Sequence, residues 1–187
     1  MTHYSVRIPP VSSDKFTAEQ KELVGDGWWK DLHYCQVLMQ HPALYQVFNP
    51  LIAKVISDTN LPPRDRQILV LRTLGLCDEV YEKTHHEHIS HNAGLSDSDI
   101  AAAESGGSGL APFEQTLMKA AEELVRDQRI SDTTWDSLAQ RYSKEQLMEV
   151  VGLVGAYTAM AMIMKTFGIP LETPEELARL QALRHYT

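Results

Sequence analysis

Cysteine, basic charge and long hydrophobic runs are all scarce in this sequence, and each shortage excludes a class of protein. The only cysteines, Cys35 and Cys77, form no CxxC pair and cannot make a disulfide framework, so we expect a reducing, cytoplasmic environment. The 17 Lys and Arg residues are outnumbered by 25 Asp and Glu residues, which gives a formal net charge of −8. Because a phosphate backbone requires a concentrated basic surface, we expect no nucleic-acid partner.

The hydrophobic runs are shorter than a typical membrane helix. The longest run, 150–164, includes two glycines and a threonine, and a membrane span needs about 20 apolar residues. The first residues of the chain also lack the apolar core of a signal peptide. We therefore expect no membrane partner, and we expect the run to form a helix that is buried within the protein.

Helical periodicity is abundant. Apolar residues recur three and four positions apart, and no stretch alternates in the way of a half-buried strand. Capping residues and prolines set the expected boundaries. The expected helices are 17–25, 32–40, 43–57 with a kink at Pro50, 64–76, 80–93, 96–104, 112–129, 131–141, 143–167 and 175–184. Ser105 to Gly109, a glycine-rich lid or linker, is the one plainly flexible segment. The sequence thus predicts an all-α protein.

Four of the eight histidines lie between positions 85 and 91. On a helix, His86 shares a face with Glu82 and Ile89, and the apolar end of that face should point inward. His85 and His88 lie on an adjacent face, with His91 one turn further on. In one interpretation Glu82 orients and charges His86, and the imidazole moves a proton.

Two other interpretations of the histidines are open. Histidines three or four apart on a helix can chelate a metal, but the HExxH pattern fails because Ser90 stands at its last position, and only Glu82 with His85 matches Glu-x-x-His. The third interpretation is structural, because exposed histidines are common on helix rims and an inward histidine is usually a hydrogen-bonded core residue.

Several motifs, in this order, carry a resemblance to a known family. They are LPPRDRQILVLR at 61–72, Tyr81-Glu82 followed by His86, and Ala93-Gly94-Leu95-Ser96, with a weaker echo at 150–157 and 167–171. Together they resemble the carboxymuconolactone decarboxylase family, which also holds the alkylhydroperoxidase D-like proteins. The resemblance implies an alkylhydroperoxidase D-like helical bundle. It would be one domain over 1–187 with an N-terminal helical extension of about 1–42, assembled as a homo-oligomer (trimer or hexamer).

The peroxidase branch of that family uses a glutamate, a CxxC pair and a histidine as a thiol relay. If His86 matches the relay histidine, the glutamate position is Gln67 and the cysteine positions are Glu79 and Glu82. A disulfide-cycling peroxidase needs two neighbouring thiols, and this chain has none there. We therefore do not expect a thiol peroxidase.

The resemblance then implies the decarboxylase-like chemistry of the family. We expect a cofactor-free lyase or isomerase that uses histidine acid–base chemistry on a small lactone, enol-acid or phenolic metabolite. The expected catalytic residues are His86 as general acid/base, Glu82 as its orienting partner, and Gln67 and Tyr81 as donors; the expected substrate-binding residues are His85, Cys77 and Tyr157. The expected set includes no metal site. The alternatives are a non-catalytic ligand-binding or scaffold protein of the same fold, and a metal-dependent enzyme that uses the cluster from His85 to His91.

Overall fold

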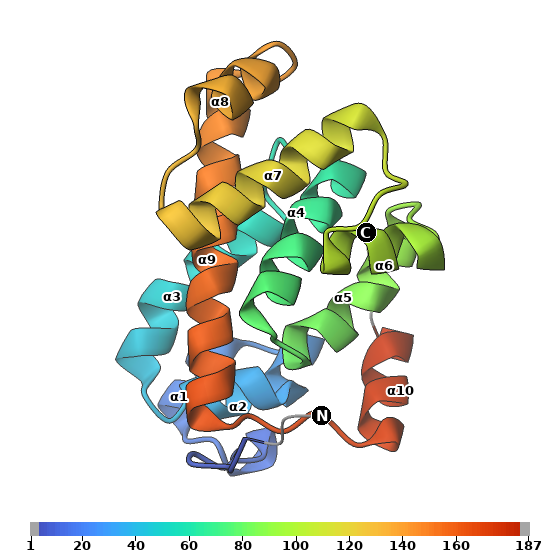
Figure 1. The fold of residues 1–187 in the computed structure, drawn as a ribbon. Helices are drawn as coiled ribbons and strands as arrows, with labels where there is room; N and C mark the ends of the chain where they lie inside the picture. Colours follow the sequence, from blue (N-terminus) through green and yellow to red (C-terminus); the bar gives the residue numbers. More distant parts are fainter. Residues whose placement is uncertain (1–3, 184–187) are drawn as a thin grey trace. The chain divides into compact units, whose positions relative to one another are not determined.

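The computed structural model describes residues 4–183, and within that range every regular element is a helix. The α-helices are α1 Ala18–Val24, α2 His33–Leu38, α3 Pro42–Ile56, α4 Pro63–Cys77, α5 Tyr81–Asn92, α6 Asp97–Ser105, α7 Pro112–Asp127, α8 Asp132–Ala139, α9 Lys144–Phe167 and α10 Pro174–Leu183 (Figure 1). Of two short 3-10 helices, η1 Ser13–Lys15 precedes α1 and η2 Trp28–Asp31 lies between α1 and α2. The predicted all-α class is confirmed.

The helix ends follow the local signals in the sequence. Thr17 and Gln20 form a reciprocal capping box at the start of α1, which satisfies backbone N–H groups that have no partner within the helix. Ser143 and Gln146 do the same before α9. Gly94 follows α5 with a φ of +84°, a left-handed conformation that glycine adopts without steric cost.

The chain divides into two compact units, and the first consists of Met1–Leu51 and Ile163–Thr187. Within its described part, the backbone N–H of Arg7 donates to the carbonyl of Phe167 at 2.8 Å. The backbone N–H of His33 donates to Glu172 Oε1 at 2.8 Å. Burial raises the pKa of the Cys35 thiol to about 12, so Cys35 behaves as a small apolar core residue.

The second unit, Ile52–Met162, is built around α4. This helix packs against α5, α6 and α7 (Figure 1), and Ile68, Leu69 and Leu71 are completely buried within it. A helix that is covered on most sides can carry apolar residues around much of its circumference. Gly75 allows a close approach to α6, because a Cβ at this position would overlap the backbone carbonyl of Glu104. Packing against α6 and α7 therefore fixes the position of α4, and α5 lies against the same helix.

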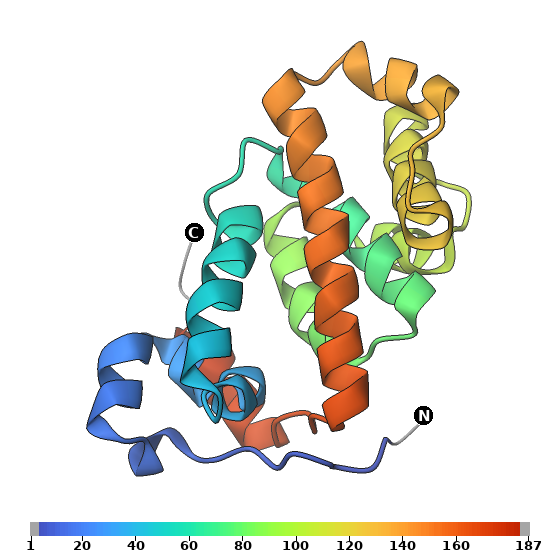
Figure 2. The same ribbon diagram turned by 90° about the vertical axis from the view of Figure 1, so that its left-hand side faces the viewer.

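Helix α9 contains the predicted buried run and is continuous through Gly152 and Gly155 (Figure 2). By length and composition it is apolar enough to cross a membrane, and half of its most apolar window is buried inside the protein. Leu153, Tyr157 and Met160 lie on its buried side. Tyr157 is thereby brought into the interior of the second unit.

Candidate active site

The N-terminus of α5 is held by a buried carboxylate. Glu79 accepts hydrogen bonds from the backbone N–H groups of Tyr81 and Glu82, at 2.8 and 2.7 Å. These N–H groups lie in the first turn, where they have no partner within the helix and where the helix dipole favours negative charge. Glu79, one of the two glutamates that stand where the thiol relay would have cysteines, therefore fixes the start of α5.

The periodicity of α5 separates its histidines into two environments. The buried side consists of Tyr81, Glu82, His85, His86 and Ser90. His88 is half-buried, whereas Glu87 and His91 are exposed to solvent. The predicted inward position of Glu82 and His86 is confirmed, and His85 is buried with them.

Both ring nitrogens of His86 have hydrogen-bonding partners from other helices. Nδ1 lies 2.8 Å from Oε1 of Gln67 on α4, and Nε2 lies 2.7 Å from the hydroxyl of Tyr157 on α9. A carbonyl oxygen can only accept, so the pairing assigns the ring proton to Nδ1. In the neutral imidazole, Nε2 accepts the hydroxyl proton of Tyr157, whereas in the imidazolium Nε2 donates to the hydroxyl oxygen. The same geometry fits both protonation states, and in the neutral state the basic nitrogen faces a phenol.

The other side of Gln67 completes this network. Its Oε1 also accepts from Ser90 Oγ at 3.2 Å. Its Nε2 is buried and has no hydrogen-bond partner within the part of the chain that the structure describes. The Gln67 side chain thus uses its carbonyl to orient His86 and has its amide N–H groups available for a further acceptor.

Glu82 supplies negative charge near the same nitrogen of His86. Its Oε2 lies 3.8 Å from His86 Nε2, one turn apart on α5. This distance suits charge attraction to an imidazolium better than a hydrogen bond. The ring is thus oriented by its hydrogen bonds with Gln67 and Tyr157, and Glu82 can stabilise the charged form of His86.

The remaining predicted site residues lie at different places in the second unit. The rings of Tyr81 and His85 pack together on the buried side of α5, with centroids 5.0 Å apart. Cys77 is the last residue of α4 and is half-buried. It lines neither of the two cavities described below.

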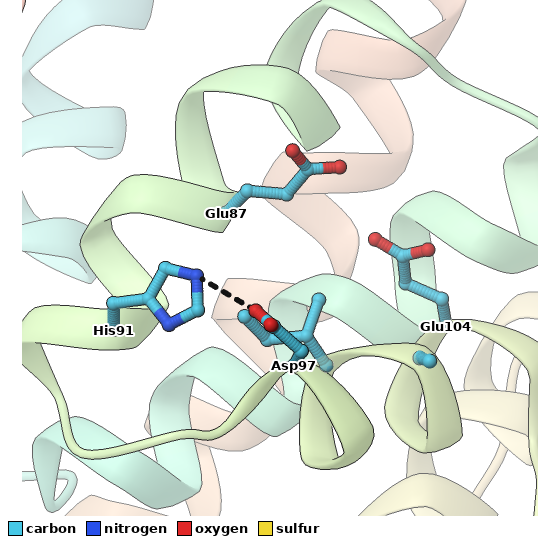
Figure 3. Close-up of a pocket in the computed structure, with 6 residues that line it drawn as sticks. Glu87, His91, Asp97 and Glu104 are labelled. Atoms are coloured by element: carbon cyan, nitrogen blue, oxygen red, sulfur yellow. Dashed lines mark ion pairs between the residues drawn. The ribbon is translucent and has the colours of Figure 1, made fainter.

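The exposed side of α5 borders an acidic cavity of about 250 Å³. Figure 3 shows Glu87 and His91 of α5 facing Asp97 and Glu104 of α6, with His91 Nε2 3.3 Å from Asp97 Oδ1. A second cavity of about 310 Å³ has Glu79 and Lys83 in its wall. Among residues 4–183, no group of three or more His, Cys, Asp or Glu side chains is arranged to hold a metal ion.

Two polar residues around Gln67 have no role in the sequence-based expectations: Ser90, whose hydroxyl shares Gln67 Oε1 with His86, and Arg66, which precedes Gln67 on α4. Ser90 could have been recognised, because it lies four positions after His86 and so shares its helical face. Arg66, next to Gln67 on α4, carried no such signal. Its importance depends on which charged groups surround it, and helical spacing does not specify them.

Sequence comparisons identify no relative, since no protein-family model and no curated protein matches the chain. Solved structures show the fold. An alkylhydroperoxidase AhpD core, an uncharacterised peroxidase-related protein from Ralstonia eutropha JMP134, superposes with a TM-score of 0.76 and 11% identity, covering 92% of this chain and 95% of the other. A peroxidase-related protein from Silicibacter sp. TM1040 gives a TM-score of 0.68 and 9% identity, covering 92% and 94%.

A protein of unknown function from Agrobacterium tumefaciens, a candidate AhpD of antioxidant defence, gives a TM-score of 0.66 and 18% identity. The match covers 73% of this chain and 95% of that protein. At these identities the likeness extends to the fold alone. The chain has the AhpD-like all-α fold that its motifs predict, in a sequence without the CxxC pair.

Proposed function

We propose that this protein is a thiol-independent enzyme that moves a proton with His86 and Tyr157, as a lyase or isomerase of a small lactone, enol acid or phenolic metabolite. One observation carries the proposal: Gln67, His86 and Tyr157 form an unbroken buried chain of hydrogen bonds from three different helices. General acid–base catalysis requires a positioned proton donor or acceptor, and an imidazole fixed in this way can serve as one.

The chemistry follows from the donor and acceptor roles in the chain. Tyr157 can take a proton from a substrate carbon as its own hydroxyl proton passes to His86 Nε2, which leaves an enolate and an imidazolium. Glu82 stabilises that imidazolium from 3.8 Å. Returning the proton to a different carbon completes an isomerisation, with no oxidant or reductant consumed.

A decarboxylation uses the same groups but starts from the imidazolium of His86 and not from the neutral ring. The bond to the carboxylate breaks, carbon dioxide leaves, and its electron pair remains on the substrate as an enolate. Tyr157 then protonates carbon, and the imidazolium of His86 restores the hydroxyl proton. Water reprotonates His86 for the next cycle. Gln67 keeps Nδ1 protonated throughout and thereby presents Nε2 to Tyr157.

Solvent exchange tests this proposal before the substrate is known. Candidate lactones and enol acids are incubated with the protein in deuterated water, and deuterium at carbon is followed by NMR. We expect exchange with the wild type, none above background with Tyr157→Phe or His86→Asn, and full exchange with His91→Asn as the matched control. Binding of an acid without any exchange would contradict the proposal and favour the non-catalytic ligand-binding alternative.

A further inference from the structure

The arginines of α4 differ in a way that the proposed proton transfer does not explain. Arg64 forms ion pairs with Glu114 at 2.6 Å and with Asp99 at 3.2 Å. Arg72 pairs with Glu122 at 2.6 Å and donates to a backbone carbonyl. For Arg66 no carboxylate lies within ion-pair distance among residues 4–183, and its Nε is buried without a hydrogen-bond partner. An unsatisfied buried donor of this kind destabilises the folded protein unless a ligand supplies an acceptor.

The position of Arg66 relates it to the site. It immediately precedes Gln67, and Tyr157 is the titratable group that interacts with its charge. Burial lowers the pKa of Arg66, but a guanidinium remains protonated at any physiological pH. The positive charge of half-buried Arg66 therefore interacts electrostatically with Tyr157, whose hydroxyl faces His86.

Gln67 adds a second unsatisfied donor. Its side chain is 1% exposed, its carbonyl is occupied by His86 and Ser90, and its Nε2 has no acceptor within the described residues. Neighbouring residues of one helix thus offer only N–H groups. A group that satisfies both must be an acceptor, and the charge of Arg66 favours an anion.

We infer that Arg66 and the Gln67 amide form a carboxylate-binding subsite beside the His86–Tyr157 pair, so that the ligand of this protein is a small organic acid. A guanidinium binds a carboxylate through two parallel N–H bonds. The Gln67 amide N–H groups would donate to an oxygen of the same carboxylate or to the enolate oxygen that forms next to it. The inference rests on the proposed function only for the identity of the reacting atoms.

Binding of benzoate tests the subsite without any turnover, and benzamide is the uncharged control of the same shape. The affinity of benzoate is measured by titration, with the Nε–H signal of Arg66 followed by NMR. We expect benzoate to shift that signal and benzamide to leave it unchanged. We expect Arg66→Met to weaken benzoate binding at least tenfold, Arg66→Lys to weaken it less, and Arg129→Met, an exposed arginine in the same unit, to bind as the wild type does.

Stability separates a binding role from a structural one. Because Arg66 has an unsatisfied buried donor, Arg66→Met should keep or raise the melting temperature, whereas loss of a structural arginine would lower it. Equal binding of benzoate and benzamide, or undiminished benzoate binding by a folded Arg66→Met protein, would overturn the inference. His86→Asn should lose proton exchange but still bind benzoate, so the subsite and the proposed function can fail independently.

Discussion

Helix α5 carries two pairs of a glutamate and a histidine on opposite sides. Glu82 and His86 lie on the buried side, and Glu87 and His91 lie on the exposed side. On the buried side, both nitrogens of His86 lie within 2.8 Å of partners on other helices. On the exposed side, His91 faces Asp97 at 3.3 Å across an open cavity (Figure 3). A fixed imidazole in a water-poor interior can transfer a proton along a defined path, whereas an exposed pair is weakened by solvent screening.

The largest difference should be in catalysis. Replacing Tyr157 by Phe or His86 by Asn removes one member of the proton path, and we expect turnover of an identified substrate to fall by about 10²- to 10⁴-fold. His91→Asn, on the exposed side, should leave kcat and KM unchanged. Steady-state kinetics on the three folded variants make the comparison. Equal losses in all three would show that the two sides do not differ in function.

Stability should show the next largest difference. Gln67→Met keeps the size of the side chain but leaves the donors of His86 and Ser90 without an acceptor, so we expect unfolding to become easier by about 1–3 kcal/mol. Asp97→Ala breaks an exposed pair and should change the unfolding free energy by about 0–1 kcal/mol. Urea denaturation followed by circular dichroism measures both. A greater loss for Asp97→Ala would reverse the ranking of the two sides.

The pH dependence of activity should shift when Gln67, the partner of His86 Nδ1, is replaced by a charged residue. A carboxylate in Gln67→Glu favours the imidazolium and raises the pKa of His86. Isomerisation requires neutral His86, so the activity that is lost as the pH falls should be lost at a higher pH in Gln67→Glu than in the wild type. A pH–rate profile measures this shift. An unchanged acidic limb would mean that His86 is not the titrating base.

Metal removal should have the smallest effect. The acidic and histidine side chains of residues 4–183 include no group of three arranged for one ion, so we expect chelator treatment to leave the melting temperature and the activity unchanged. Elemental analysis of tag-free protein purified without chelators provides an independent measurement. Near-stoichiometric zinc, iron or manganese would contradict this prediction and revive the metal interpretation of the histidine cluster.

Local chemistry was sufficient to predict the helices and one side of the site. Capping residues such as Thr17 and Ser143 act within three residues of themselves, and the 3.6-residue period placed Glu82 and His86 on one inward face of α5. The family resemblance indicates Gln67 as the counterpart of a relay residue, and Tyr157 is predicted only as a substrate-binding residue. The periodicity of one helix, however, could not show that Tyr157 contacts His86.

The tertiary structure decided which groups meet. Tyr157 and His86 are 71 residues apart in the sequence, and their contact exists because the buried side of α9 presents a hydroxyl at the depth of the imidazole. The same holds for Arg66, which, unlike Arg64 and Arg72, has no carboxylate within ion-pair distance among residues 4–183. The amino-acid sequence by itself determined the helices, because hydrogen bonds within a helix are local. The proton path and the unsatisfied donors depend on distances between helices, which only side-chain packing sets.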